Sequence, residues 1–323
     1  MSKSMGFMLL KNSRRWLAKE PEGWSWGDPR TLNLDMIWQE VHRFEMPSGM
    51  DISFHGGGII VFHFQPNSKT MPNNEELDEQ LRALSERVKY MNAFCFCLHA
   101  SCLEKEELGL ETTSPTKRDI FIYRGSPTLL SGEAIETLPT NDRKLDKNRP
   151  FTGPGYIGKE ALDEAGRRLA GLAHSVEAKL LDQAALINQA IHNYQNHNFS
   201  SAVTLAWTVC EFIQDQKWVE HLAKSRHRIA GETLSNSKRD RASDINSSKV
   251  TGILNAIGII PDDLKNEIDQ VRSNRNNWLH SMKEPGRVDA ERAIKTSAKL
   301  LENASKDTFP VALMLMSPSL EVN

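Results

Sequence analysis

The sequence is poor in cysteine, with four in 323 residues. So few cysteines cannot build the framework of a disulfide-stabilised secreted domain, and a reducing compartment is the simpler setting. No segment reaches the roughly 18 consecutive apolar residues that a membrane-spanning helix needs. The amino terminus also lacks the basic, apolar and small-residue regions of a signal peptide. We therefore expect a cytoplasmic protein with no membrane association.

An excess of charge of either sign is also missing. The chain has 40 basic and 42 acidic residues, and its formal net charge is −2. This balance excludes a uniformly basic nucleic-acid coat and an acidic tail protein, but it leaves room for a local basic patch. Internal repeats and low-complexity segments are absent too. The length fits two domains of ordinary size.

The first part of the chain mixes short apolar strands with one long helix. We expect an α+β domain of unknown type at residues 1–137, with a candidate role in sensing or recruitment. A linker rich in proline, glycine and charge follows at residues 138–156. The expected strands are 51–54 and 59–64, which flank three glycines as a hairpin, and 119–123, and the expected helix is 75–108.

Beyond the linker nearly every segment has helical periodicity. We expect an all-α helical domain at residues 157–307 and a partly apolar tail at 308–323, so the fold class of the whole chain is α+β. The expected helices are 159–193 (one long helix or two short ones), 200–224 with Ser200 as N-cap, 250–257, 261–282 with Pro261 as its first residue, and 289–304.

One of these helices carries residues suited to phosphate chemistry. Arg275 and His280 lie five residues apart, and Asn276 directly follows the arginine. A guanidinium binds phosphate through a planar set of donors and does not deprotonate. An imidazole can accept and release a proton near neutral pH.

The spacing sets how these side chains can meet. Asn276 and His280 are four residues apart, so they share one helix face, where Asn276 can orient the ring or bind a phosphate oxygen. Five residues on an α-helix rotate by about 140°. Arg275 and His280 therefore converge only through the long arginine side chain, a local distortion or a symmetry mate.

The helical domain resembles the HEPN family of all-α domains. The segment Arg275-Asn276-Asn277-Trp278-Leu279-His280 is similar to the family signature of arginine, polar residue, three residues and histidine. An earlier helix with Ala206-Trp-Thr-Val-Cys-Glu211 and a final amphipathic helix complete the similarity, which covers roughly residues 160–305.

The resemblance implies a metal-independent endoribonuclease that acts as a homodimer and needs no cofactor. The ribose 2′-hydroxyl would attack the adjacent phosphorus. His280 would act as acid and base, Arg275 would stabilise the charge on phosphorus, and Asn276 would orient them. The family further implies a prokaryotic antiviral defence or toxin setting, with RNA as substrate and an antitoxin or effector protein as a candidate partner. The alternative is a catalytically silent module for dimerisation or binding, or a subunit of a larger effector complex.

Further residues are candidates for supporting this site. Glu211 is a candidate partner of Arg275 or Arg272, and the alternative is a partly exposed surface charge. A basic segment follows, which would bind the RNA backbone, although a solvated loop explains it equally well. Its six basic residues are Lys224, Arg226, Arg228, Lys238, Arg239 and Arg241.

A metal site is not expected. Cys95, His99 and Cys102 fall on one face of the long helix, and thiolates with imidazole suit zinc. However, the C-x-x-C spacing of structural zinc sites is absent, and the cysteines lie in an apolar run. They are therefore interpreted as small core residues.

Overall fold

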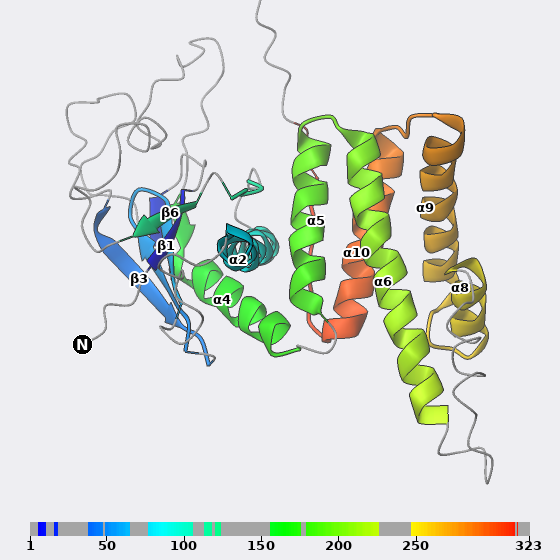
Figure 1. The fold of residues 1–323 in the computed structure, drawn as a ribbon, viewed down its shortest axis with the longest axis horizontal. Coiled ribbons are helices and arrows are strands. Elements are labelled where there is room, and N and C mark those ends of the chain that lie inside the picture. The colour runs from blue at the N-terminus through cyan, green and yellow to red at the C-terminus, as the bar shows by residue number, and fades with distance from the viewer. Residues whose placement is uncertain are drawn as a thin grey trace, which may run out of the picture. The chain divides into compact units, whose positions relative to one another are not determined.

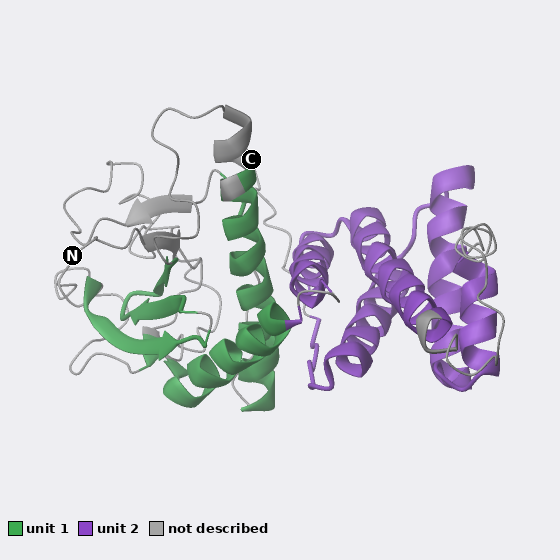
Figure 2. Ribbon diagram, turned by 60° about the horizontal axis from the view of Figure 1, so that its bottom comes forward, with its two compact units in different colours: residues 1–174 green, residues 175–323 purple. Residues whose placement is uncertain are grey.

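The computed structural model divides the chain into two compact units, residues 1–174 and 175–323 (Figure 2). The residues that the structure describes are 6–10, 16–18, 38–47, 49–64, 77–105, 113–117, 120–123, 156–175, 179–225, 247–313 and 315.

The first unit is built on a five-stranded sheet in which all neighbouring strands are antiparallel. Its order is β3 (Glu40–Glu45), β4 (Asp51–His55), β5 (Ile59–His63), β1 (Gly6–Leu10) and β6 (Ile120–Tyr123) (Figure 1). Two short strands, β2 (Trp16–Ala18) and β7 (Tyr156–Gly158), pair in parallel beside it.

The predicted hairpin is present as β4 and β5. Three glycines connect these strands, and Gly58 has a φ of 89°, which favours glycine over any other residue. Phe54 of β4 and Phe62 of β5 are completely buried. Both rings contact Phe94 of α2 (Leu77–Glu104), with centroid distances of 5.8 and 5.6 Å. Because side chains alternate along a strand, this face of the sheet carries the apolar core.

Helix α4 (Lys159–His174) packs against α2 and β3. A Cβ at Gly166 would lie 2.5 Å from the ring of Phe44, so only glycine allows the helix to approach β3 this closely. Nearby, the Nε2 atom of His42 lies 2.6 Å from the Oδ1 atom of Asp163.

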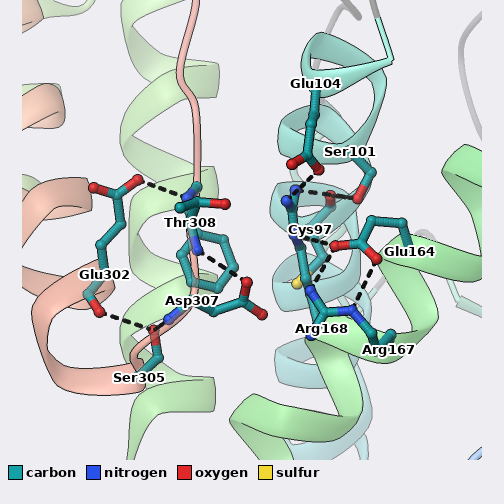
Figure 3. A network of polar contacts seen from close by, with 11 residues as sticks. Cys97, Ser101, Glu104, Glu164, Arg167, Arg168, Glu302, Ser305, Asp307 and Thr308 are labelled. Carbon is teal, nitrogen blue, oxygen red and sulfur yellow. Dashed lines mark hydrogen bonds and ion pairs between the residues drawn. The ribbon is translucent and has the colours of Figure 1, made fainter.

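A buried arginine joins α4 to α2 (Figure 3). Arg168 is 1% exposed, and its Nη2 atom donates to Oε2 of Glu104 at 2.6 Å. Its Nε atom lies 3.1 Å from Oε1 of Glu164, and Nη1 donates to Ser101 at 3.3 Å. A buried charge is tolerated when it is paired in this way. The arginine therefore ties α4 to the first unit, and the boundary between the units lies at residue 174. The predicted boundary was the linker over 138–156, most of which is outside the described residues.

The opposite face of the sheet holds a buried polar chain. The Nδ1 atom of His55 lies 2.7 Å from the carbonyl oxygen of Trp38, which can only accept, so Nδ1 carries the hydrogen. The Nε2 atom of His55 then accepts from the Ser53 hydroxyl at 3.2 Å. The same hydroxyl oxygen accepts from Nε2 of His63 at 2.8 Å. The hydrogen bonds therefore run in one direction, and burial lowers the pKa of both imidazoles.

The second unit is a helical bundle. Helix α6 (Phe199–Ser225) packs against each of the other four helices that the structure describes in this unit, which are α5 (Leu180–Gln195), α8 (Ser247–Ala256), α9 (Asp262–Ser281) and α10 (Arg287–Ser305) (Figure 1). Helix α10 also packs against α5 and α9.

The predicted helices are present with small shifts at their ends. The segment 159–193 forms two helices, α4 and α5, which belong to different units. Helix α6 begins one residue before the predicted cap, because Asn198 supplies the capping oxygen. Its Oδ1 atom accepts from the amide of Ser201 at 3.3 Å.

The α+β fold class is confirmed, with strands in the first unit and a helical second unit. Among the described residues, no helix combines the length and the apolar character needed to cross a bilayer.

Candidate functional site

The candidate site lies on α9, whose ends follow from its sequence. Pro261 precedes the helix with a φ of −70°, one position earlier than predicted. Asp262 and Asp263 occupy the first turn, where acidic side chains interact favourably with the helix dipole. At the other end Met282 adopts the left-handed conformation, with a φ of 52°, and its amide donates to the carbonyl of Trp278 at 3.0 Å. The motif thus occupies the last two turns of a regular helix.

Arg275 lies in line with the buried face of this helix. Leu264, Ile268 and Val271 are buried in the bundle, and Arg275 follows Ile268 by two turns. The guanidinium is therefore half-buried, and its Nε atom is buried with no hydrogen-bond partner among the described residues. Its Nη1 atom donates to Oδ1 of Asn276 at 3.0 Å. The Nη1 atom of Arg272, on the same helix, is likewise buried without a hydrogen-bond partner among the described residues, and such donors are uncommon in folded proteins.

His280 lies elsewhere on the helix. Its side chain is exposed in the last turn, about 140° around the axis from Arg275. The structure gives it no hydrogen bond to Arg275 or Asn276, although all three residues are described. A single chain therefore brings together Arg275 and Asn276 but not His280. Only a symmetry mate or a bound substrate could bring an imidazole to the arginine.

The start of α10 holds α9 beside the motif. Asn274 donates to Oδ1 of Asp289 at 2.7 Å, and the other carboxylate oxygen accepts from the amide of Gly286 at 3.0 Å. One carboxylate therefore caps α10 and binds α9 one residue before Arg275. This contact fixes the helix position from which the arginine extends.

Exposed apolar side chains surround the end of α9. Leu279, Met282 and Val288 are 42%, 74% and 65% exposed. Met282 projects from a left-handed backbone, which costs a non-glycine residue of the order of 1 kcal/mol. An apolar group that is both strained and exposed favours a contact surface here.

Glu211 pairs with neither Arg272 nor Arg275, and the alternative interpretation, a partly exposed charge, describes it. Arg272 instead pairs with Asp269 of its own helix, Nη2 to Oδ1 at 2.9 Å, because a carboxylate three residues away already lies on its face. The half-buried Glu211 forms no ion pair with either arginine. It acts on Asp215, whose pKa is raised by burial first and by the charge of Glu211 second.

The predicted basic segment falls almost wholly outside the described residues. Lys224 lies near the end of α6, but its side chain is not described. The other members of the segment, Arg226, Arg228, Lys238, Arg239 and Arg241, lie between residues 226 and 246, which the structure does not describe. Their role in RNA binding stays a prediction.

No metal site is found in the described part of the chain. No group of three or more His, Cys, Asp or Glu side chains there could hold an ion. The four cysteines are buried as free thiols. Burial also raises the pKa of the Cys210 thiol far above its ordinary value, which makes it a poor nucleophile.

Sequence reasoning missed two features of this helix. It gave no role to Asn274, whose partner is 15 residues away and on another helix. It also gave no role to the exposed uncharged side chains of α9. The signal for these was present, since Asn266, Gln270, Ser273 and Asn277 recur at spacings of four, three and four.

Comparisons with protein families, with curated proteins and with solved structures found no match to this chain. The site is therefore judged on its own residues: a half-buried guanidinium with an unmatched donor, an adjacent amide, and an exposed imidazole on one helix of an all-α bundle.

Proposed function

We propose that the second unit is a metal-independent endoribonuclease of the HEPN type, active as a homodimer. The observation that carries the proposal is the state of Arg275, whose guanidinium is half-buried beside Asn276 and keeps an unmatched buried donor. Guanidinium donors match the oxygens of a phosphate, and a phosphodiester would satisfy this one.

The proposed reaction needs only groups that the chain supplies. The 2′-oxygen of a ribose forms a bond to the adjacent phosphorus while the bond from phosphorus to the 5′-oxygen breaks. One imidazole takes the proton of the 2′-hydroxyl, and a second imidazole gives a proton to the leaving 5′-oxygen. The products are a 2′,3′-cyclic phosphate and a 5′-hydroxyl. Arg275 would stabilise the added negative charge on the phosphorane.

Arg275 and His280 are separated within one chain, and a dimer would allow the residues of one copy to meet those of the other. Two copies supply two imidazoles, one as base and one as acid. The exposed side chains of Leu279, Met282 and Val288 beside the motif support a contact between copies. A role in prokaryotic antiviral defence or as a toxin is part of the same proposal, by family resemblance alone.

The test is the chemistry of the RNA ends. Purified protein should cut RNA in the presence of EDTA and leave 2′,3′-cyclic phosphates. Arg275→Ala and His280→Ala should each lower the rate by about 10²–10⁴-fold, as expected for a charge-stabilising group and an acid–base group. The paired variant should lose little more, because residues that act as a unit are not additive.

Matched controls come from the same bundle. His192→Ala on α5 and Lys295→Ala on α10 remove an imidazole and a cation outside the motif, and both should keep full activity. Cleavage that survives in the Arg275→Ala, His280→Ala protein, or that stops with EDTA, contradicts the proposal.

A second candidate function is a silent dimerisation module. The absence of a hydrogen bond between His280 and its motif partners favours it. It predicts a stable dimer by light scattering that leaves RNA uncut at every pH.

A further inference from the structure

Helix α9 presents an exposed face without charged side chains. From Leu264 to the end of the helix, none of the exposed residues is Asp, Glu, Lys or Arg. On α10, by contrast, Arg287, Lys295 and Lys299 are exposed. The exposed residues of this part of α9 are Asn266, Gln270, Ser273, Asn277, Leu279, His280 and Ser281.

Four charged residues of α9 are paired within the bundle. Lys265 pairs with Asp269 at 2.8 Å, and Asp269 also binds Arg272 at 2.9 Å. Glu267 binds Lys299 of α10 at 2.7 Å. All four of these α9 residues are half-buried. Helix α9 therefore contains charged residues, but they do not lie on its exposed face.

The uncharged side chains form one straight line. Asn266, Gln270, Ser273 and Asn277, which we term the polar stripe, are spaced four, three and four residues apart, and three more residues lead to His280. This spacing keeps residues on one side of an α-helix, and the line to His280 is about 21 Å long. In the described structure Gln270 donates to Asn274 at 3.3 Å, while the other three side chains have no hydrogen-bond partner.

The stripe has the chemistry of base recognition. Amide side chains can pair with the donors and acceptors on nucleobase edges, and this face offers no exposed Lys or Arg that would bind phosphates instead. Resting on the proposed function, we propose that the polar stripe binds the bases of a single-stranded RNA segment whose adjacent phosphate lies at His280. Single-stranded RNA fits because its bases are unpaired and reach a helix surface, whereas the major groove of duplex RNA is too narrow for side chains to read.

A second copy of the chain is a poorer occupant. Interfaces between identical subunits have an apolar core, and the polar stripe offers no apolar side chain. The exposed Leu279 lies about 150° around α9 from the middle of the stripe, so copies can associate on that side and leave the stripe open.

The experiment measures binding separately from cleavage. Its probe is a fluorescent 2′-O-methyl RNA of mixed sequence, which lacks the attacking hydroxyl and cannot be cut by the proposed reaction. The triple variant Asn266→Ala, Gln270→Ala, Ser273→Ala should weaken binding about 10–100-fold, since each lost hydrogen bond counts for about 1 kcal/mol and 1.4 kcal/mol is tenfold. The slope of affinity against salt concentration should not change, because none of the three side chains carries a charge.

Unfolding would not explain such a loss. All three positions are exposed, and alanine favours the helix over the residues it replaces. A second variant, Gln270→Glu with Asn277→Asp, keeps the shape of both side chains and should weaken binding at least tenfold by repelling RNA. Asn303→Ala, which removes an exposed amide from α10, is the matched control and should bind as the wild type does.

The other outcomes overturn the inference in distinguishable ways. Unchanged affinity in the triple variant, with RNA cleavage intact, excludes the stripe and leaves the nuclease standing. Loss of the dimer by light scattering assigns the stripe to a second copy. Stripe-dependent binding without cleavage of ordinary RNA supports the inference and contradicts the proposed nuclease.

Discussion

The first unit and helix α9 of the second unit use their polar side chains in opposite ways. In the first unit Arg168, Ser53 and His55 are buried and bind other side chains of the same unit. On α9 four charged residues are paired at half-buried positions, and none of the exposed residues after its first turn is Asp, Glu, Lys or Arg. Elsewhere the second unit has buried polar contacts as well, such as the Thr251 hydroxyl that donates to Oε1 of Gln214. The contrast is therefore between a buried network that joins two helices of the first unit and a helix face whose polar groups remain exposed.

The strongest test of this comparison is the network around Arg168. The double variant Glu104→Ala, Glu164→Ala leaves a buried guanidinium without its carboxylates and should cost about 3–5 kcal/mol. Arg168→Met should cost less, because Glu104 and Glu164 are 44% and 20% exposed and can turn to water. Urea unfolding, followed by hydrogen exchange in α2 and α4, measures both. If both variants lost the same free energy of unfolding, the buried charge of Arg168 would not be what makes the loss of its carboxylates costly.

An intermediate effect is expected from pH. Burial lowers the pKa of His55 and His63 below the ordinary 6.5, so the unfolded chain binds protons that the folded chain does not. The free energy of unfolding should therefore fall as the pH drops below about 7, by at most about 1.4 kcal/mol per pH unit for each imidazole. The nearby charges of Glu40, Arg43 and Asp51 modify this response.

The measurement is urea unfolding of the first unit between pH 5 and 8. His63→Gln keeps a donor for Ser53 and should flatten the curve. His174→Gln, at the exposed end of α4, is the control and should leave it steep. If the free energy of unfolding of the wild type did not change in this pH range, the prediction that His55 and His63 destabilise the fold at low pH would be wrong.

The smallest effect is expected in the second unit. Asn274→Ala removes the bond to Asp289 and should lower the free energy of unfolding by about 1 kcal/mol. Asn277→Ala, three residues along the same helix, removes an exposed amide and should cost nothing in stability. Thermal unfolding compares the two. A loss at Asn277 as large as at Asn274 would mean that the exposed face of α9 also supports the fold.

The sequence predicted the helices well, because apolar residues at helical spacing bury one face and need no distant information. It missed β1, β2, β3 and β7. Strand β2 is only three residues long, and β3 carries Glu40, Arg43 and Glu45 on a mostly exposed edge, so neither has a strong apolar alternation. The place of α4 was missed for another reason. Its position depends on Arg168 meeting Glu104, a contact between residues 64 apart.

In the motif too, features set by spacing along the helix could be predicted, whereas features set by contacts with other helices could not. The angle between Arg275 and His280 follows from helix geometry, and their separation in the structure agrees with it. The buried Nε of Arg275 could not be predicted, because it depends on how α9 lies against its neighbours. The partner of Arg272 could have been found at the sequence level, since Asp269 is three residues away.

The position of Arg275 has a consequence for the history of the chain. It continues the line of Leu264, Ile268 and Val271, where a leucine would bury apolar surface and leave no donor unmatched. Selection removes only side chains that take a protein below the stability it needs, so an arginine that weakens the fold can persist at such a position. Residue 275 thus costs the isolated chain some stability, and under the proposed function a bound phosphate would satisfy the unmatched donor and raise the stability of the folded state.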